Sequence, residues 1–87
     1  MTEQATQRRW ARVLSSADLG RFLAELRAER DWTQTELAGE LGISRRYLYE
    51  IESGKPSLYS DRLFALLRLL GARLTVEADV PAGERVR

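Results

Sequence analysis

The segment Thr33–Ser53 constrains the fold more than any other part of the 87-residue chain, because it carries the boundary signals of two successive short helices. Thr33 is followed three residues later by Glu36, the capping-box pattern in which each side chain binds the other residue's backbone N–H. Gly42 supplies the positive φ that ends the first helix. Ser44 can cap the second helix. The segment therefore predicts two short helices joined by a sharp turn.

The apolar residues of this segment fit close packing of the two helices. The first helix, about Gln34 to Leu41, has the small Ala38 where the helices must approach each other. The second helix, which Ser53-Gly54 stops, has Leu48 and Ile51 on one face. The remaining face of the second helix is thereby left for other contacts.

Helical spacing of apolar residues predicts a further helix on each side. The earlier one begins at the N-caps Ser15 and Ser16, ends near Arg30, and has Gly20 on the face opposite its apolar stripe. The later one follows a loop with Leu58 and Tyr59, begins at Ser60 or Asp61, and closes at Gly71. The apolar stripes are Leu19, Phe22, Leu23 and Leu26 in the earlier helix, and Leu63, Leu66, Leu67 and Leu70 in the later one.

Polar and apolar residues alternate from Arg73 to Ala78, which predicts a half-buried strand. A single strand cannot satisfy its own backbone donors and acceptors, so this strand needs a partner. One candidate is the same segment of a second copy, antiparallel across a two-fold axis. The other is Trp10–Leu14, within one chain or between two.

Composition limits the remaining possibilities. Cysteine and histidine are both absent, which removes disulfides and the usual zinc or haem frameworks. We therefore expect no cofactor, no metal site and no enzymatic activity. No apolar run approaches the ~20 residues of a membrane span, so a cytoplasmic protein is expected. The net charge of +1 gives no hint of nucleic-acid binding, and any basic patch must be local. A domain this small has marginal stability, which oligomerisation can raise.

The stretch WTQTELAGELGISRRYLYEIESGK resembles the Xre/Cro-type helix-turn-helix family. The resemblance covers about Leu19 to Gly71, and LLRLLGARLTVE makes the chain most similar to the HipB-like antitoxins. It implies a mainly α fold, a compact four- to five-helix lambda-repressor-like helix-turn-helix domain followed by one short C-terminal β-strand that pairs across a dimer. The expected organisation is an N-terminal, partly disordered arm (1–14), the DNA-binding domain (15–71), the dimerising strand (72–80) and a flexible tail (81–87).

The same resemblance implies a function. Members of this group are sequence-specific DNA-binding repressors that bind palindromic operator DNA as homodimers. HipB-like members repress their own operon and bind a HipA-like kinase toxin. Two alternatives remain open from the sequence, a stand-alone Xre-type transcriptional regulator and a protein-interaction module that has lost DNA binding.

Residue by residue, the resemblance also implies a DNA-binding site. Gln34 matches a phosphate-contacting glutamine at a helix N-terminus, where backbone donors suit an anion. Arginine at a base-reading position can form paired hydrogen bonds with guanine. The base-reading positions match Ser44, Arg45, Arg46 and Tyr49, and Lys55 is expected to meet a phosphate. The roles of Tyr47, expected to be half-buried or on the phosphate backbone, and of Glu50 stay open.

Other residues have expected structural roles. Glu52 matches a family glutamate that pairs with an arginine of the preceding helix, here Arg27, and the pair is expected to orient the second helix of the motif. Gly42 is expected to shape the turn. Spare apolar surface and the strand predict a dimer interface that includes Phe64, Leu69, Leu74 and Val76.

Overall fold

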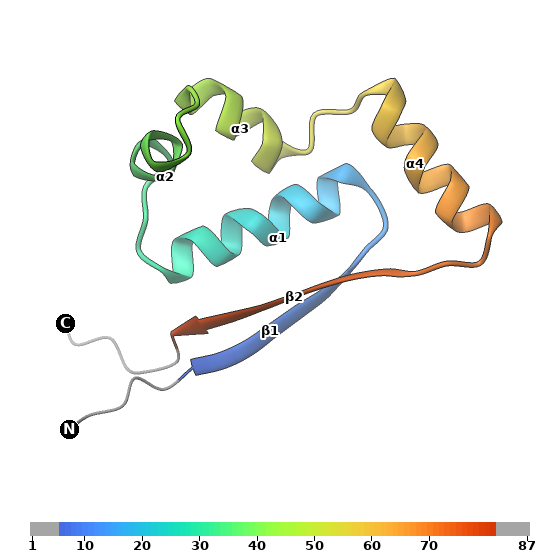
Figure 1. The fold of residues 1–87 in the computed structure, drawn as a ribbon, viewed down its shortest axis with the longest axis horizontal. Helices are drawn as coiled ribbons and strands as arrows, with labels where there is room; N and C mark the ends of the chain where they lie inside the picture. Colours follow the sequence, from blue (N-terminus) through green and yellow to red (C-terminus); the bar gives the residue numbers. More distant parts are fainter. Residues whose placement is uncertain (1–5, 82–87) are drawn as a thin grey trace.

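The computed structural model describes residues 6–81, which form one strand, then four helices, then a second strand (Figure 1). The two strands lie side by side beneath α1 and bring the ends of the described chain together (Figure 1). In chain order the elements are β1 (Thr6–Val13), α1 (Ser16–Glu29), α2 (Gln34–Leu41), α3 (Arg45–Ser53), α4 (Leu58–Leu69) and β2 (Leu74–Pro81).

The two central helices have the boundaries that the sequence predicts. The capping box is formed, since Thr33 Oγ1 accepts from the backbone N–H of Glu36 at 3.0 Å and Glu36 Oε1 accepts from that of Thr33 at 2.8 Å. Gly42 ends α2 with φ of 73°, and Gly54 ends α3 with φ of 71°. At both ends only glycine adopts this backbone without a Cβ penalty. The predicted α2 and α3 are confirmed.

Helix α1 crosses α3 at Gly20, which is buried. A Cβ at this position would lie 2.4 Å from the carbonyl oxygen of Glu52 and 2.5 Å from that of Ile51. The backbones of the two helices therefore touch where a side chain would keep them apart. The placement of Gly20 on the outer face of α1 was wrong, because the helical pattern does not show where another backbone approaches.

Helix α4 starts earlier than the sequence suggested. Its cap is Ser57, whose Oγ accepts from the backbone N–H of Ser60 at 3.0 Å, while Ser60 Oγ accepts from that of Ser57 at 3.2 Å. This reciprocal pair starts the helix at Leu58 rather than after Ser60 or Asp61. Leu58 and Tyr59, expected in a loop, lie in its first turn.

The compact unit within residues 6–81 has three helices, because α3 packs on both α1 and α2 while α4 has no comparably close contact with another element. The expected four- to five-helix compact domain is therefore wrong for the described part of the chain. Helix α4 stands to one side of this unit (Figure 1). The buried apolar residues of the core are Val13, Phe22, Ala38, Leu48, Phe64 and Val80.

The strands form a two-stranded antiparallel sheet within one chain. Thr6 lies opposite Pro81, and Val13 lies opposite Leu74. The expected pairing of the C-terminal strand across a dimer is thus corrected, because β2 pairs along one edge with the chain's own N-terminal segment, the other candidate that the sequence left open. The arm expected over 1–14 is a strand from residue 6 onward. Residues 1–5 of that arm, and the tail expected after Pro81, lie outside the described residues.

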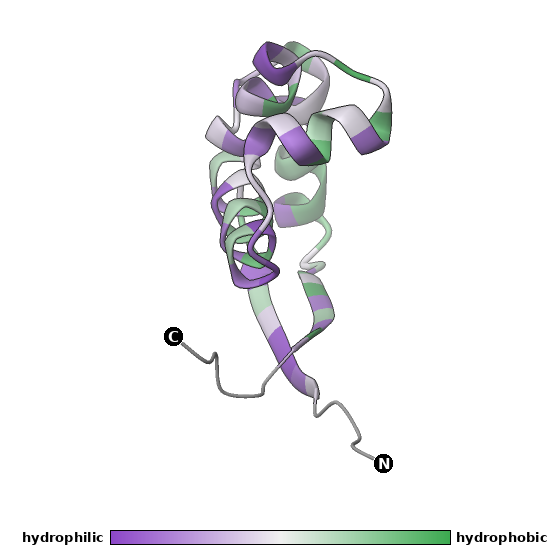
Figure 2. Cartoon of the chain, turned by 90° about the vertical axis from the view of Figure 1, so that its left-hand side faces the viewer, coloured by the Kyte–Doolittle hydropathy of each residue, from purple (hydrophilic) through white to green (hydrophobic). Residues whose placement is uncertain are grey.

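One face of the sheet packs on α1, and the other faces solvent. Val13 and Val80 are fully buried at the two ends of the inner face. Arg9, also on this face, lies over the ring of Phe22 at 5.8 Å and forms ion pairs with Glu25 and Glu29 on α1. The helices gather at one end of the molecule, and the strands, with hydrophobic and hydrophilic residues in bands, extend beyond them (Figure 2). None of the helices in residues 6–81 is long and apolar enough to cross a membrane.

Candidate nucleic-acid interface

The turn between α2 and α3 holds the two helices at a fixed angle. The backbone N–H of Ile43 donates to the carbonyl of Ala38 at 3.0 Å, and that of Gly42 donates to Gly39 at 3.2 Å. Ala38 and Leu48 are buried where the helices meet. These contacts satisfy the carbonyls that α2 leaves open at its C-terminus. They form a rigid support for α3.

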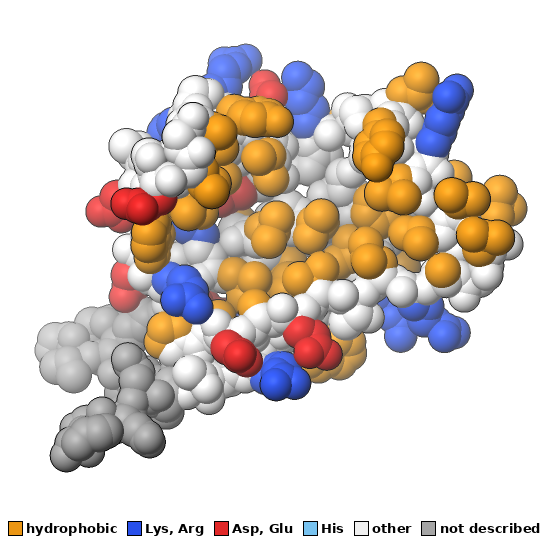
Figure 3. Space-filling view, in the orientation of Figure 1, with side chains coloured by type: hydrophobic (Ala, Val, Ile, Leu, Met, Phe, Trp, Pro, Cys, Tyr) orange, Lys and Arg blue, Asp and Glu red, His pale blue; other side chains and the backbone are white. Residues whose placement is uncertain are grey.

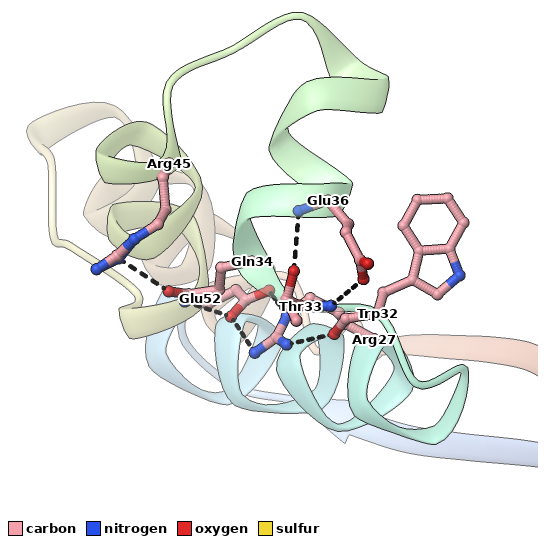
Figure 4. Close-up of polar contacts among 7 residues, drawn as sticks. All are labelled: Arg27, Trp32, Thr33, Gln34, Glu36, Arg45 and Glu52. Carbon is pink, nitrogen blue, oxygen red and sulfur yellow. Dashed lines mark hydrogen bonds and ion pairs between the residues drawn. The ribbon is translucent and has the colours of Figure 1, made fainter.

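An ion pair between the buried Glu52 and the half-buried Arg27 joins α3 to α1. Arg27 Nε donates to Glu52 Oε2 at 2.7 Å, and Arg27 Nη2 donates to Glu52 Oε1 at 3.0 Å (Figure 4). The remaining terminal nitrogen of Arg27 donates to the backbone carbonyl of Trp32 at 2.8 Å. Two parallel bonds to one carboxylate fix orientation as well as distance. The pair sets the position of α3 on α1.

The ion pair shifts the pKa values of both partners. Burial favours the neutral form of Glu52, but hydrogen bonds from Arg27 and Gln34, together with the Arg27 charge, outweigh it and lower the pKa of Glu52. The hydrogen bond to Glu52 raises the pKa of Arg27, against the opposing effect of burial. Both groups are therefore charged at neutral pH.

Gln34 connects this ion pair to the outer face of α3. Its Nε2 donates to Glu52 Oε1 at 2.9 Å, and its Oε1 accepts from Arg45 Nη1 at 3.3 Å (Figure 4). The side-chain amide is thus engaged on both sides. The sequence predicted a role for Gln34 at the start of α2 but did not predict this bridge. The local pattern around Gln34 does not indicate it, because Arg45 and Glu52 lie 11 and 18 residues further along the chain.

The outward face of α3 presents the residues expected to read bases. Arg45 and Tyr49 lie one helical turn apart, and Arg46 is beside them. All three are exposed, with the Arg46 side chain 87% exposed, whereas Leu48 and Glu52 on the other side are buried. The helix is therefore divided into an anchored side and a free side. The free side carries two guanidinium groups and a phenol.

Glu50 lies between two cations of this surface. Its Oε2 is 3.7 Å from Arg46 Nε and 3.6 Å from Lys55 Nζ. The side chains of Arg46 and Lys55 are exposed to solvent, and ion pairs of this kind contribute at most about 1 kcal/mol to stability. The carboxylate can therefore release either cation to a stronger anion.

Ser44 and Tyr47 lie next to this face. Ser44 Oγ accepts from the backbone N–H of Tyr47 at 3.0 Å and so caps α3, which leaves its hydroxyl hydrogen free to donate. Tyr47 is 55% exposed, as is Tyr49. Of the two positions expected for Tyr47, half-buried or on the phosphate backbone, this exposure is compatible with the second, because Tyr47 lies outside the packed side of α3.

The residues expected at a dimer interface differ in exposure within one chain. Phe64 is buried within its own chain, and Leu69 is 85% exposed at the end of α4. Leu74 and Val76 are half-buried opposite Val13 and Ala11 of β1.

A helix pair held at a fixed angle, with one face buried and the other cationic and free, is the arrangement of a helix-turn-helix. Residues 18–80 match the family model described as a helix-turn-helix domain. The chain belongs to the helix-turn-helix family. The matched region begins within α1 and extends into β2 as far as residue 80.

Two curated relatives of this helix-turn-helix protein have names that refer to gene regulation: one is named as a transcriptional regulator and the other as a control-region protein. It is 32% identical over 74 residues to the uncharacterized HTH-type transcriptional regulator y4mF of Sinorhizobium fredii (strain NBRC 101917 / NGR234), covering 85% of this chain and 93% of that protein. It is 42% identical over 43 residues to the ImmF control region 10 kDa protein of Bacillus phage phi105, and this match covers 49% of this chain and 48% of that protein. No solved structure matches the chain significantly.

Proposed function

We propose that this protein is a sequence-specific DNA-binding transcriptional repressor in which α3 is the recognition helix. The observation that carries the proposal is the division of α3 into two faces. Leu48 and Glu52 are buried, while Arg45, Arg46 and Tyr49 project to solvent. A helix anchored on one side can enter the major groove with its free side. Family membership and the regulator y4mF support the same function.

The proposed roles follow from the position of each residue. Arg45 and Arg46 bind guanine edges, which accept two hydrogen bonds from a guanidinium. Tyr49, on the same face, and the hydroxyl of Ser44 contact neighbouring bases. Lys55, at the exposed end of α3, contacts a phosphate.

Gln34 has a double role in this proposal. Its backbone N–H lies in the first turn of α2, where unpaired donors suit a phosphate. Its side chain holds Arg45 at 3.3 Å and Glu52 at 2.9 Å. Contact with the DNA backbone and the position of a reading arginine are thereby coupled in one residue.

The repressor acts as a homodimer on a palindromic operator. Two recognition helices related by a two-fold axis fit successive major grooves ~34 Å apart. The side chain of Arg30 also fixes β2, because its Nη2 donates to the carbonyl of Asp79 at 2.9 Å.

The protein further serves as the HipB-like antitoxin of a HipA-like kinase toxin and represses its own operon. This part of the proposal is supported by the small size of the helical region, α1 to α4, and by the strand β2 that follows it. Co-expression with the adjacent reading frame tests it. A kinase-like neighbour that copurifies with the protein and arrests growth without it supports the antitoxin role. A neighbour without either property favours a stand-alone regulator.

A titration of purified protein against two DNA duplexes tests the regulator function itself. One duplex comes from the region upstream of the gene, and the other has the same length and base composition in scrambled order. Binding at least about 10³-fold tighter to the upstream duplex is expected for a specific regulator. Equal affinity for both contradicts sequence-specific recognition.

A further inference from the structure

A band of hydrophobic side chains runs from α2 and α3 across α1 to α4 on one side of the molecule (Figure 3). Part of the band is a groove of about 360 Å³ between α1, α2 and α3. Its walls include Leu26, Leu37, Leu41 and Ile51. Leu41 and Ile51 are 57% and 39% exposed, although they belong to the helices that form the core.

Helix α4 contributes an apolar ridge to the same band. Tyr59, Leu63, Leu66 and Leu70 recur at intervals of four, three and four residues, the spacing of a helix–helix packing stripe. The four side chains are 38 to 78% exposed. Phe64, on the other side of α4, is buried against its own chain. Helix α4 therefore turns a complete packing stripe toward solvent.

We propose that the occupant of the groove is α4 of a second copy of this chain, in a reciprocal exchange. The ridge and the groove lie on one face, as a two-fold interface requires, because each copy then offers both to the other. This inference rests on the homodimer proposed above and names its surface. The predicted interface of Leu74 and Val76 is replaced by one formed by helices.

The connections of α4 favour exchange over closure within one chain. Its start follows Gly54, whose added Cβ would lie 2.3 Å from the Cα of Ala17, so this end is held at the first turn of α1. Its other end leads to Leu74, which pairs with Val13 just before α1. The groove lies instead at the second half of α1, with Leu23, Leu26 and Arg30.

The exchange leaves the DNA-binding face open. Ile51 lines the groove from the side of α3 opposite Arg46 and Tyr49. Two copies joined through their grooves therefore keep both recognition faces in solvent.

Light scattering of the whole chain at micromolar concentration is the first test. The expected mass is twice the 10.0 kDa of one chain. Leu66→Asp places a charge in the ridge and is expected to give a monomer with an unchanged circular dichroism spectrum, because this side chain is already exposed. Arg68→Asp, on the opposite side of the same helix, is the matched control and is expected to stay dimeric. A monomeric wild type overturns the proposal, because the groove and the α4 ridge would then be left to another partner. A dimeric Leu66→Asp variant overturns it as well.

Cysteine cross-linking then identifies the surfaces, since the chain has no cysteine of its own. One copy carries Leu41→Cys or Ile51→Cys in the groove, and the other carries Leu66→Cys or Leu70→Cys on α4. A disulfide between the two copies in at least one of the four combinations is expected. The exchange is overturned if the dimer forms none of these cross-links, or if a cross-link forms only between two α4 helices. It is also overturned if a chain that carries both cysteines forms the disulfide only within itself. Such a result leaves the DNA-binding function untouched, because Arg45→Ala/Arg46→Ala measures that separately.

Discussion

Glu52 on α3 receives two hydrogen bonds from Arg27 on α1, at 2.7 and 3.0 Å, and a third from Gln34 on α2 at 2.9 Å. One buried carboxylate thus joins all three helices of the compact unit. Through Gln34 the same network reaches Arg45 on the exposed face. The stability of the unit and the position of a proposed DNA-reading side chain consequently depend on one residue.

Replacing Glu52 by alanine is expected to lower the free energy of unfolding by about 3 kcal/mol, because it leaves the half-buried guanidinium of Arg27 without its charged partner. Urea denaturation measures the loss. Glu50→Ala is the matched control on the same helix, since its ion pairs are with the exposed Arg46 and Lys55, and a loss below about 1 kcal/mol is expected. Equal losses in both variants would contradict a structural role specific to Glu52.

Stability should fall in acid partly through Glu52. The pKa of Glu52 in the folded state is lowered, so its contribution is fully present above its ordinary pKa of about 4.3 and is lost as the pH falls through the lower folded value. Glu52→Gln cannot titrate and should show a smaller decrease in unfolding free energy between about pH 5 and pH 3. Parallel pH profiles of the two proteins would show that Glu52 has no lowered pKa.

Two glycine substitutions should have opposite effects on stability. Gly20→Ala forces apart the backbones of α1 and α3, where the added Cβ meets Glu52 O at 2.4 Å, and should cost about 1–3 kcal/mol. Gly39→Ala, in the middle of α2 with open space around the added Cβ, should stabilise the protein by about 0.4–1 kcal/mol. Thermal unfolding compares them. A neutral Gly20→Ala would mean that the helices do not approach each other this closely.

The helix boundaries around the turn were predictable because their signals are local. Thr33 and Glu36 are three residues apart, Ser44 bonds to a backbone three residues on, and Gly42 and Gly54 act at their own positions. The exposed Arg45, Arg46 and Tyr49 could likewise be placed from their spacing to Leu48 and Ile51. Short-range rules are sufficient for these features.

The features that could not be predicted depend on residues distant in the sequence. Nothing in the local pattern around Gly20 shows that Glu52 lies against it, 32 positions later. The strand β1 is polar and basic, so the sequence offered Trp10–Leu14 only as one of two candidate partners for β2, and the pairing with β2 and the packing on α1 decide between them. The bridge from Glu52 through Gln34 to Arg45 required the angle between α2 and α3, which only the folded chain supplies.

The most direct test of the recognition face is a titration of Arg45→Ala/Arg46→Ala against the upstream duplex and its scrambled counterpart at two salt concentrations. Unchanged circular dichroism establishes that the variant is folded, and Lys55→Ala serves as the phosphate-contact control, with weaker binding to both duplexes and a salt slope smaller by about 1. The account predicts that the double variant loses at least about tenfold more affinity for the upstream duplex than for the scrambled one. Undiminished discrimination between the two duplexes would contradict it.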